Sequence, residues 1–239
     1  MVSVLIPAYN ESARIGSTIH AVRQVDVEDM IEIIVVDDGS VDGTAEAAEA
    51  AGADTVLRQR HAGKGAALRS AFALGCGGTL VLLDADLGDT ASEAGKLLAP
   101  ILCGEADMTI ATFPTRQGRG GGAGLVVRLA RWGIRRLTGV SMTTPLSGQR
   151  ALSRVVVNSC GGFAEGWGVE IALTVRALWQ GYCVREIATT MDHRVTGRTV
   201  AGVLHRAAQF SAALRVLVRL WILRIRRGDV TVTKNTGDG

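Results

Sequence analysis

The sequence is short of aromatic residues, prolines and clustered cysteines. Its 239 residues include 4 Phe, 4 Trp, 2 Tyr and 4 Pro, so we expect a core of aliphatic side chains. We expect no secretory leader, because Met1 is followed directly by a strand-like run, and the sequence contains no apolar run of roughly 18 residues. We therefore expect a cytoplasmic protein without a membrane-spanning helix. The cysteines are far apart and form no CxxC pair, which argues against structural zinc and favours a reducing compartment; they are Cys76, Cys103, Cys160 and Cys183.

Charge is divided unevenly along the chain. Apolar residues make up 47% and charged residues 21%, which excludes disordered and collagen-like chains. The formal net charge is only +3, but residues 1–115 carry −10 and residues 116–239 carry +13. An acidic half joined to a basic half predicts a metal-binding side and an anion-binding side. Two solvated surfaces of opposite charge are the alternative.

Apolar runs alternate with helical patterns in the first 112 residues. The runs are apolar on both faces, which is typical of parallel strands buried between helices. Ligands of such sheets bind beyond the carboxyl ends of the strands, where the polar residues of this half are found. The pattern predicts an α/β fold, mainly a parallel sheet flanked by helices, with strands over residues 2–6, 31–36, 55–57, 79–83 and 108–112 and helices over 12–24, 44–51, 64–74 and 90–103.

The second half is richer in helices. We expect one strand over residues 184–191 and helices over 125–137, 169–179 and 200–227. No repeat or linker divides the chain, so we predict a single domain followed by a flexible tail. The boundaries are 1–227 for the domain, 1–112 and 113–227 for its two halves, and 228–239 for the tail.

Two acidic segments follow predicted strands. Asp84 and Asp86 are two residues apart, a spacing that turns both carboxylates to one side, where they could bind one hard cation. A helix N-cap is the alternative for one of them. The segment 37–44 reads DDGSVDGT; it contains a turn and lacks the Glu of an EF-hand loop. Lys64 belongs to no P-loop, because Arg58 stands where that motif needs its first glycine.

Four segments of the first half resemble the family-2 glycosyltransferases of GT-A fold. They are IPAYNE at 6–11, VVDDGSVDGT at 35–44, GKG at 63–65 and DAD at 84–86. The second half is similar to the glucosyl-3-phosphoglycerate synthases in GGG at 120–122, PLSG at 145–148, GWGVEI at 166–171 and His193. The polyprenyl-phosphate sugar transferases are a second, weaker resemblance. The first half would then bind a nucleotide sugar and the second half its acceptor.

The resemblance implies roles for the residues at the strand ends. Lys64 would neutralise a phosphate or contact the base edge. Asp86 and His193 would hold Mg²⁺ or Mn²⁺ at the diphosphate, which leaves only when its charge is stabilised. Asp86 and Glu170 would be catalytic; Glu170 would deprotonate the acceptor in an inverting enzyme and position the sugar in a retaining one. The residues that would bind the nucleotide sugar are Pro7, Ala8, Glu11, Asp38, Ser40, Lys64, Asp84 and Ala85.

The resemblance also implies an acceptor and residues for its phosphate. We expect glucose to pass from UDP-glucose to a small phosphorylated acceptor such as 3-phosphoglycerate. A polyprenyl-phosphate glycosyltransferase at the membrane surface and a non-catalytic nucleotide-sugar-binding protein are the alternatives. The soluble-acceptor family follows its glycines with Arg-Val-Thr, whereas this chain continues with Ala123, Gly124 and Leu125. The implied phosphate-binding residues are Arg119, Gly122, Ser147, Arg194 and Arg198.

Apolar residues and arginines are interleaved from residue 204 to residue 227. A basic amphipathic helix containing Phe210 and Trp221 could lie on an anionic membrane, which would make the protein membrane-peripheral. The alternative, which we favour, is a helix packed on the sheet or in a homodimer contact. We expect no nucleic-acid partner, because the chain has no basic–aromatic motif.

Overall fold

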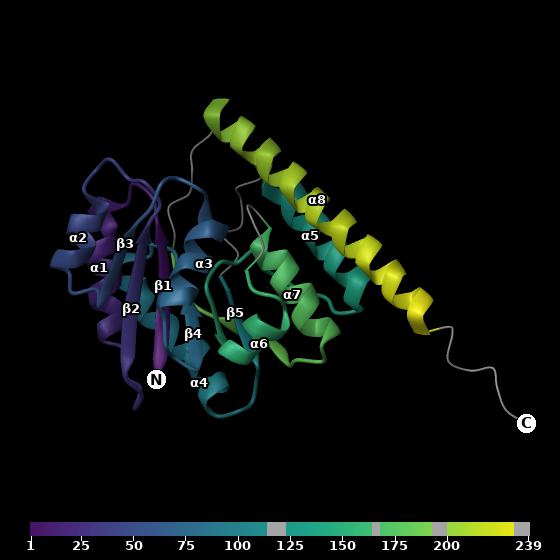
Figure 1. Ribbon diagram of the computed structural model, residues 1–239, viewed down its shortest axis with the longest axis horizontal. Helices are drawn as coiled ribbons and strands as arrows, with labels where there is room; N and C mark the ends of the chain where they lie inside the picture. Colours follow the sequence, from purple (N-terminus) through teal and green to yellow (C-terminus); the bar gives the residue numbers. More distant parts are fainter. Residues whose placement is uncertain (114–122, 164–167, 193–199, 232–239) are drawn as a thin grey trace, which may run out of the picture.

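The computed structural model describes residues 1–113, 123–163, 168–192 and 200–231 (Figure 1). The strands in these parts are β1 (Val2–Ala8), β2 (Ile31–Asp37), β3 (Thr55–Arg58), β4 (Thr79–Leu82), β5 (Met108–Thr112), β6 (Arg150–Ser153) and β7 (Val184–Ala188). They form one sheet in the order β3-β2-β1-β4-β6-β5-β7. All pairs are parallel except those of β6 with β4 and β5. The mainly parallel sheet that the sequence predicts is thus confirmed.

Both faces of β1 are buried, which explains its uninterrupted apolar sequence. Leu5 faces a core that also contains residues of α3 (Lys64–Leu74). Val4 and Ile6 face a second core, to which α1 (Ser12–Arg23), α2 (Thr44–Ala50) and α4 (Ala94–Leu102) contribute. Because β1 to β4 are parallel, their carboxyl ends lie at one edge of the sheet. The loops that carry the predicted site residues start from that edge.

The strand β6 was not expected from the sequence. It is only four residues long, and its apolar pattern is too short to separate strand from helix. It lies antiparallel between β4 and β5 and is followed directly by α6 (Arg154–Ser159). Through β6 the two halves of the chain share one sheet.

Several predicted boundaries differ from the structure. The strand expected at 79–83 ends at Leu82, and the strand expected at 184–191 ends at Ala188. The helix expected at 90–103 is a 3₁₀ segment, η1 (Gly88–Glu93), followed by α4. The last helix, α8 (Val200–Thr231), continues past residue 227, where the tail was expected to begin.

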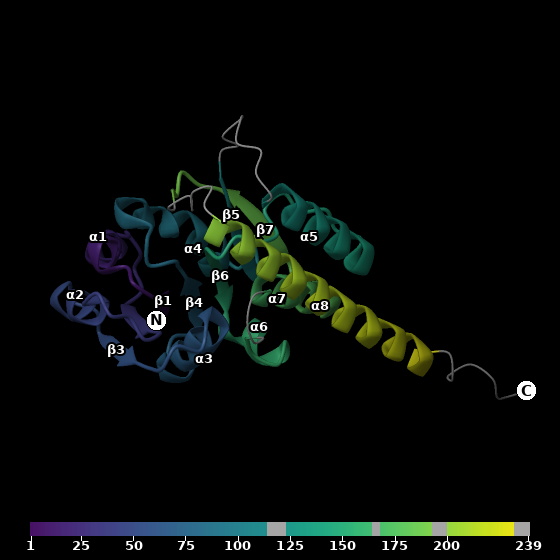
Figure 2. The same cartoon turned by 90° about the horizontal axis from the view of Figure 1, so that it is seen from above.

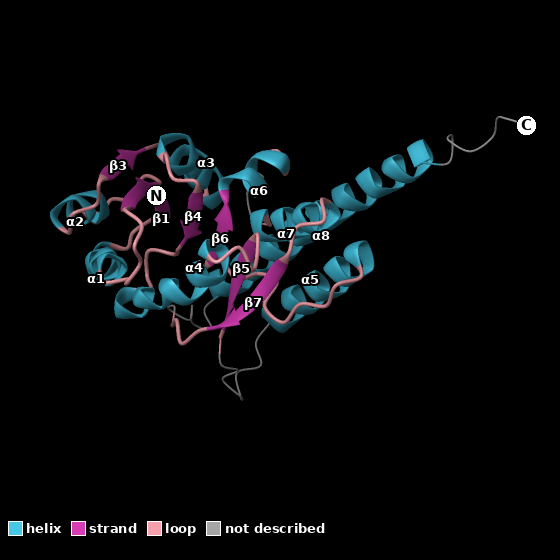
Figure 3. Ribbon diagram, turned by 90° about the horizontal axis from the view of Figure 1, so that it is seen from below, coloured by secondary structure: helices cyan, strands magenta, loops and turns pink. Residues whose placement is uncertain are grey.

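The helices of the second half form a layer beside the sheet (Figures 2 and 3). They are α5 (Ala123–Thr138), α7 (Val169–Trp179) and α8. Gly133 of α5 faces Leu217 of α8, and the carbonyl of Leu137 accepts a hydrogen bond of 2.7 Å from Arg224. The two helices therefore run side by side in the same direction, and the end of α8 extends beyond the rest of the molecule (Figure 1).

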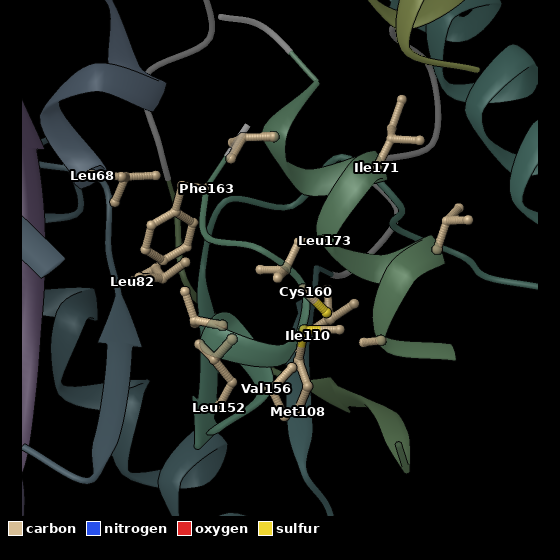
Figure 4. Close-up of a cluster of buried hydrophobic side chains, with 14 of the residues drawn as sticks. Leu68, Leu82, Met108, Ile110, Leu152, Val156, Cys160, Phe163, Ile171 and Leu173 are labelled. Carbon is tan, nitrogen blue, oxygen red and sulfur yellow. The ribbon is translucent and has the colours of Figure 1, made fainter. Parts of the chain in front are cut away.

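A mostly aliphatic core lies between the sheet and α7 (Figure 4). Leu82 of β4 and Leu68 of α3 lie next to Phe163, which also meets Phe72 edge-on at 5.7 Å between ring centroids. Phe163, Leu68 and Leu82 line a small gap that Lys64 and Glu170 close from the other side. This core is the floor on which the polar site is built. Among the described residues, no helix is long and apolar enough to cross a membrane.

Candidate active site

A cavity of about 420 Å³ opens at the carboxyl ends of β1 and β2. Two of the predicted nucleotide-sugar residues, Pro7 and Ala8, form one wall of it. Asp38 and Lys64 also line it, and the ring of Tyr9 lies against that of His61 with 4.5 Å between centroids and a tilt of 40°. An aromatic pair beside a buried carboxylate suits a flat, hydrogen-bonding base.

Asp38 organises the loop between β3 and α3. Its carboxylate is 3% exposed and accepts hydrogen bonds from the amides of Ala62 at 2.9 Å and Gly63 at 2.8 Å. The side-chain amide of Gln59 donates to it at 2.6 Å, and His61 Nδ1 lies 2.9 Å from its second oxygen. The loop that carries His61 to Lys64 is therefore fixed by one buried carboxylate.

Glu11 and Ser40 join the loops that follow β1 and β2. The amide of Asn10, which has a φ of 55°, donates to Ser40 Oγ at 2.9 Å. The amide of Glu11 donates to Thr44 Oγ1 at 2.9 Å, and its carbonyl accepts from the first amides of α1. Neither Glu11 nor Ser40 lines the 420 Å³ cavity. Both residues were predicted to bind the nucleotide sugar. In the structure they take part in the hydrogen bonds that join the two loops beside the cavity.

Lys64 lies at the centre of the site. Its Nζ donates to Asp84 Oδ1 at 2.6 Å and lies 3.4 Å from Glu170 Oε1. Gln149 Nε2 donates to the other oxygen of Asp84 at 2.6 Å. Burial favours the neutral amine, but the carboxylates of Asp84 and Glu170 outweigh it and raise the pKa of Lys64. The amine is therefore a cation near neutral pH, shared between two carboxylates.

Gly148 lets these groups approach one another. A Cβ atom at this position would lie 2.4 Å from Lys64 Nζ and 3.2 Å from both carboxylate oxygens of Asp84. No side chain fits in that space without moving the amine. The contact between Lys64 and Asp84 therefore needs a glycine at the last position of the PLSG segment.

Arg150 supports the site from below. It is fully buried, and it donates to the carbonyl of Ser147 at 2.8 Å and to the hydroxyl of Thr174 at 2.7 Å. That hydroxyl in turn lies 2.8 Å from the carbonyl of Glu170. Burial lowers the pKa of Arg150 to about 10, and the charges of Glu170 and Glu186 oppose the shift. Arg150 thereby links the 145–149 loop to the first turn of α7.

A second cavity, of about 210 Å³, adjoins the first at Lys64. Asp84 and Glu170 line its polar side, and Val126 of α5 and Ala213 of α8 line its apolar side. The first cavity is built from the first half of the chain. The second is formed largely by the second half of the chain.

The Asp84–Asp86 segment lies in the loop after β4 rather than inside the strand. Ala85 is buried, and its carbonyl accepts from Thr18 Oγ1 at 2.9 Å, while both aspartates are partly exposed. Mg²⁺ is commonly held by one or two carboxylates together with substrate phosphates and water, and this donor set fits that pattern. The described residues contain no cluster of three His, Cys, Asp or Glu that could hold a metal without a ligand.

Five of the predicted site residues lie outside the described residues. Ser147 is described, but it does not line the site. Ser147 is buried, and its hydroxyl lies 3.2 Å from Gln149 Oε1. It therefore contacts the loop that reaches Asp84 and lines neither cavity. The residues outside the described parts are His193, predicted to be a metal ligand, and Arg119, Gly122, Arg194 and Arg198, predicted to bind the acceptor phosphate.

Three residues of the site were not predicted from the sequence. Gln149 and Arg150 follow the glycine of the PLSG segment, and His61 lies two residues before Gly63. The sequence held no signal for the first two, because the strand β6 that starts at Arg150 was itself not predicted. His61 carried no signal either, since an isolated histidine in a loop is ordinary.

The family model described as glycosyl transferase family 2 matches residues 3–163, more than half of the sequence. The chain belongs to glycosyl transferase family 2. The matched range contains the four segments of the first half and the PLSG segment, and it covers Lys64, Asp84 and Gln149. The membership predicted from the sequence is confirmed.

Two groups of relatives are similar to this chain. It is 35% identical over 196 residues to the glucosyl-3-phosphoglycerate synthase of Mycolicibacterium paratuberculosis, an alignment that covers 73% of this chain but only 59% of that protein. It is 33% identical over 238 residues to the polyprenol monophosphomannose synthase of Mycolicibacterium smegmatis, covering 88% of this chain and 84% of that protein. The chain thus spans 59% of the length of this glucosyl-3-phosphoglycerate synthase.

The fold resembles that of solved relatives. The glucosyl-3-phosphoglycerate synthase of Mycobacterium tuberculosis, in complex with Mn²⁺, UDP-glucose and phosphoglyceric acid, matches with a TM-score of 0.76 at 29% identity, covering 92% of this chain and 79% of that one. The same enzyme with Mg²⁺ and UDP also gives 0.76. The expected GT-A fold is therefore confirmed.

Proposed function

We propose that this protein is a metal-dependent glycosyltransferase that moves glucose from UDP-glucose to a small phosphorylated acceptor. The observation that carries the proposal is the meeting of two cavities at Lys64, Asp84 and Glu170. One cavity has the shape and lining for a nucleotide base. The other lies where an acceptor would reach the sugar.

The reaction breaks the bond between the sugar C1 and a diphosphate oxygen, and it forms a bond from C1 to an acceptor oxygen. Mg²⁺ or Mn²⁺ held at Asp86, and at His193 outside the described residues, would neutralise charge on the leaving diphosphate. Lys64 is a fixed cation in reach of the same group, and its amine gains a phosphate partner when a donor binds. The buried charge of Arg150 adds a positive field under the site.

Glu170 has a different role in the proposal. Its carboxylate is held 3.4 Å from Lys64 at the start of α7 and lines the acceptor-side cavity. From that position it can accept a hydrogen bond from a sugar or acceptor hydroxyl. In an inverting transfer it would take the acceptor proton; in a retaining transfer it would orient the sugar.

The acceptor class is supported by the basic second half and by the relatives. The similar enzyme of Mycobacterium tuberculosis was solved with phosphoglyceric acid and also with glycerol 3-phosphate. A polyprenyl phosphate is the second candidate acceptor, because the polyprenol monophosphomannose synthase aligns over more of this chain, 88% against 73%. Both candidates present a phosphate to the site.

The test is UDP release from UDP-glucose with Mn²⁺, in the presence of 3-phosphoglycerate, of glycerol 3-phosphate, of polyprenyl phosphate, or of none. We expect at least one acceptor to stimulate release, and we expect Asp86→Ala to lower Mn²⁺-dependent UDP binding by about tenfold or more. Asp89→Ala is the matched control, because Asp89 is an exposed aspartate in η1, three residues further along the chain, and lines neither cavity.

Two results would contradict the proposal. Unchanged Mn²⁺-dependent UDP binding in Asp86→Ala would remove the metal role from this residue. Binding of UDP-glucose without release under any acceptor condition would make the protein a nucleotide-sugar-binding protein instead of an enzyme.

A further inference from the structure

The helices α5 and α8 present apolar side chains to solvent on the side away from the sheet. Phe210, Leu214, Val218 and Ile222 follow one another at intervals of four residues and are all exposed, Val218 by 50%. The opposite side of α8 is buried through Ala213, Leu217 and Leu220. We call the outer face of the two helices the α5–α8 surface; its exposed apolar residues are Leu125, Trp132, Phe210, Leu214, Val218, Ile222 and Ile225.

The helix α5 extends this surface with a tryptophan. Trp132 is 59% exposed and precedes Gly133, which packs against Leu217 of α8. The exposed indole thus belongs to the same turn of α5 as the glycine that contacts α8. On the α8 side of the same contact, Arg136 lies over the ring of Trp221 at 5.2 Å. Exposed apolar area of this extent is uncommon on a protein surface that meets only water.

Charge on the α5–α8 surface has one sign. The two helices contain ten arginines and a single acidic residue, Asp229. Their described arginines are all exposed: Arg128, Arg131, Arg135, Arg136, Arg215, Arg219 and Arg224. Arg215 is one residue after Leu214 and one turn before Arg219, which lines a cavity with Val216 and Leu220 on the flank of α8, so basic groups lie on the exposed side of α8 beyond the apolar stripe. Apolar side chains bordered by arginines are the pattern of helices that lie in the interface of an anionic membrane.

We propose that the α5–α8 surface binds an anionic lipid bilayer, with the apolar stripe inserted among the acyl chains and the arginines at the phosphates. A second copy of the chain is the other occupant that an apolar stripe could have. Two such faces brought together would place exposed arginines of one copy near those of the other, and like charges across a contact oppose association. An anionic bilayer satisfies the apolar and the charged groups at once.

The position of this surface relates it to the active site. Val126 of α5 and Ala213 of α8 line the cavity that contains Asp84, Lys64 and Glu170. The same two helices thus carry the lipid-binding face on their outer side and the acceptor-side cavity wall on their inner side. A protein bound in this way would hold its acceptor cavity within one helix layer of the bilayer. The inference does not depend on the proposed function, because binding is measured without substrate.

The experiment is flotation of the intact protein with phosphatidylcholine vesicles that contain or lack phosphatidylglycerol, at low and high salt. We expect flotation with the anionic vesicles only, weakened by salt. The variant Val218→Asp/Ile222→Asp should lose it. The matched control is Val155→Asp, at a residue of α6 that is 63% exposed outside this surface. Arg215→Gln/Arg219→Gln should weaken binding by about tenfold or more, and Arg60→Gln/Arg185→Gln should leave it unchanged.

UDP binding by each variant shows that the variant is folded and that any lost flotation concerns the surface alone. Absence of flotation by the wild-type protein would overturn the proposal. If sedimentation velocity then shows a dimer that Val218→Asp/Ile222→Asp dissociates, the stripe is a contact between two copies. Flotation that persists in both surface variants would also overturn the proposal, since the bound face would lie elsewhere.

Discussion

At the residue scale, Gly148 illustrates how the site depends on the absence of a side chain. Gly148→Ala would place a Cβ 2.4 Å from Lys64 Nζ. The lysine end is flexible and can move, so the fold should lose little stability. The amine would nevertheless leave Asp84, and a lost charge-assisted hydrogen bond of about 1.5–3 kcal/mol predicts a kcat/KM for UDP release that is about tenfold to a hundredfold lower.

The control for this prediction is Gly78→Ala. A Cβ on Gly78, between α3 and β4, would meet no atom of the described residues within 4 Å. Kinetics and the melting temperature should both stay close to wild type in this variant. If Gly148→Ala kept wild-type kinetics, the contact between Lys64 and Asp84 would have no part in turnover. If it lost activity and melted far below wild type, the loop would be structural.

At the element scale, we expect two glycine-to-alanine substitutions in helices to change the unfolding free energy in opposite directions. The first lies at the contact between α5 and α8. In Gly133→Ala the new Cβ would lie 2.4 Å from Leu217 Cδ2 and 2.6 Å from Cδ1. Leu217 is buried and cannot move freely, so overpacking should cost about 1–3 kcal/mol of unfolding free energy, more than the roughly 1 kcal/mol that alanine gains over glycine in a helix. Urea denaturation measures the difference.

Gly16→Ala in α1 is the matched helical change. Its new Cβ would meet only the Cβ of Ala51 at 3.8 Å, an ordinary contact. This variant should be neutral or more stable than wild type, by up to about 1 kcal/mol. Leu217→Ala removes the atoms that the new Cβ of Gly133→Ala would meet. In that background, Gly133→Ala should therefore lower the unfolding free energy by less than it does alone. A stabilised Gly133→Ala single variant would show that the two helices are not closely packed.

The elements that could be predicted are those with strong, long patterns. The strand β1 and the helix at Lys64–Leu74 follow from buried apolar runs and from a glycine before the helix. The strand β6 could not be predicted, because its four residues acquire strand geometry only from their neighbours β4 and β5. The helix expected at 90–103 starts as a 3₁₀ turn, a distinction that local sequence does not carry.

The same reasoning applies to the site. Asp38, Lys64 and Asp84 could be predicted, because each follows a strand or starts a helix at the carboxyl edge of a parallel sheet. Gln149 and Arg150 could not, because Gln149 reaches Asp84 from the other half of the chain and Arg150 is tied to the site only through Ser147 and Thr174. The separation of Asp84 and Gln149 by 65 residues leaves no periodic trace in the sequence.

At the scale of the whole molecule, each half contains a carboxylate that fixes a loop to a strand. Glu32 of β2 accepts hydrogen bonds from the amides of Cys76 at 2.5 Å and Gly77 at 3.1 Å, and one from the hydroxyl of Ser3. Glu186 of β7 accepts from the amides of Thr143 at 2.9 Å and Thr144 at 2.7 Å, and from both hydroxyls. The shared sheet connects these two points, so we expect the protein to unfold as one unit.

These two glutamates predict an acid-dependent stability. Burial would raise the pKa of Glu32 and of Glu186, but the hydrogen bonds they accept lower it overall. A carboxyl with a lowered pKa in the folded state contributes stability that is complete above its unfolded pKa and is lost as the pH falls through its folded pKa. The melting temperature should therefore be level from about pH 7 to pH 5 and should fall below about pH 4 in a single transition.

The variants Glu32→Gln and Glu186→Gln separate this cause from general acid unfolding. Each variant should melt below wild type near neutral pH, because an uncharged amide replaces a carboxylate that accepts several hydrogen bonds. We expect each substitution to lower the unfolding free energy by about 1–3 kcal/mol. Each should approach wild type as the pH falls through the lowered pKa of the folded wild-type carboxyl, since that carboxyl is then itself protonated. A gap that stays constant with pH would show that charge is not the cause, and two separate transitions would show that the sheet does not couple the halves. Thermal melts followed by circular dichroism across this pH range decide between these outcomes.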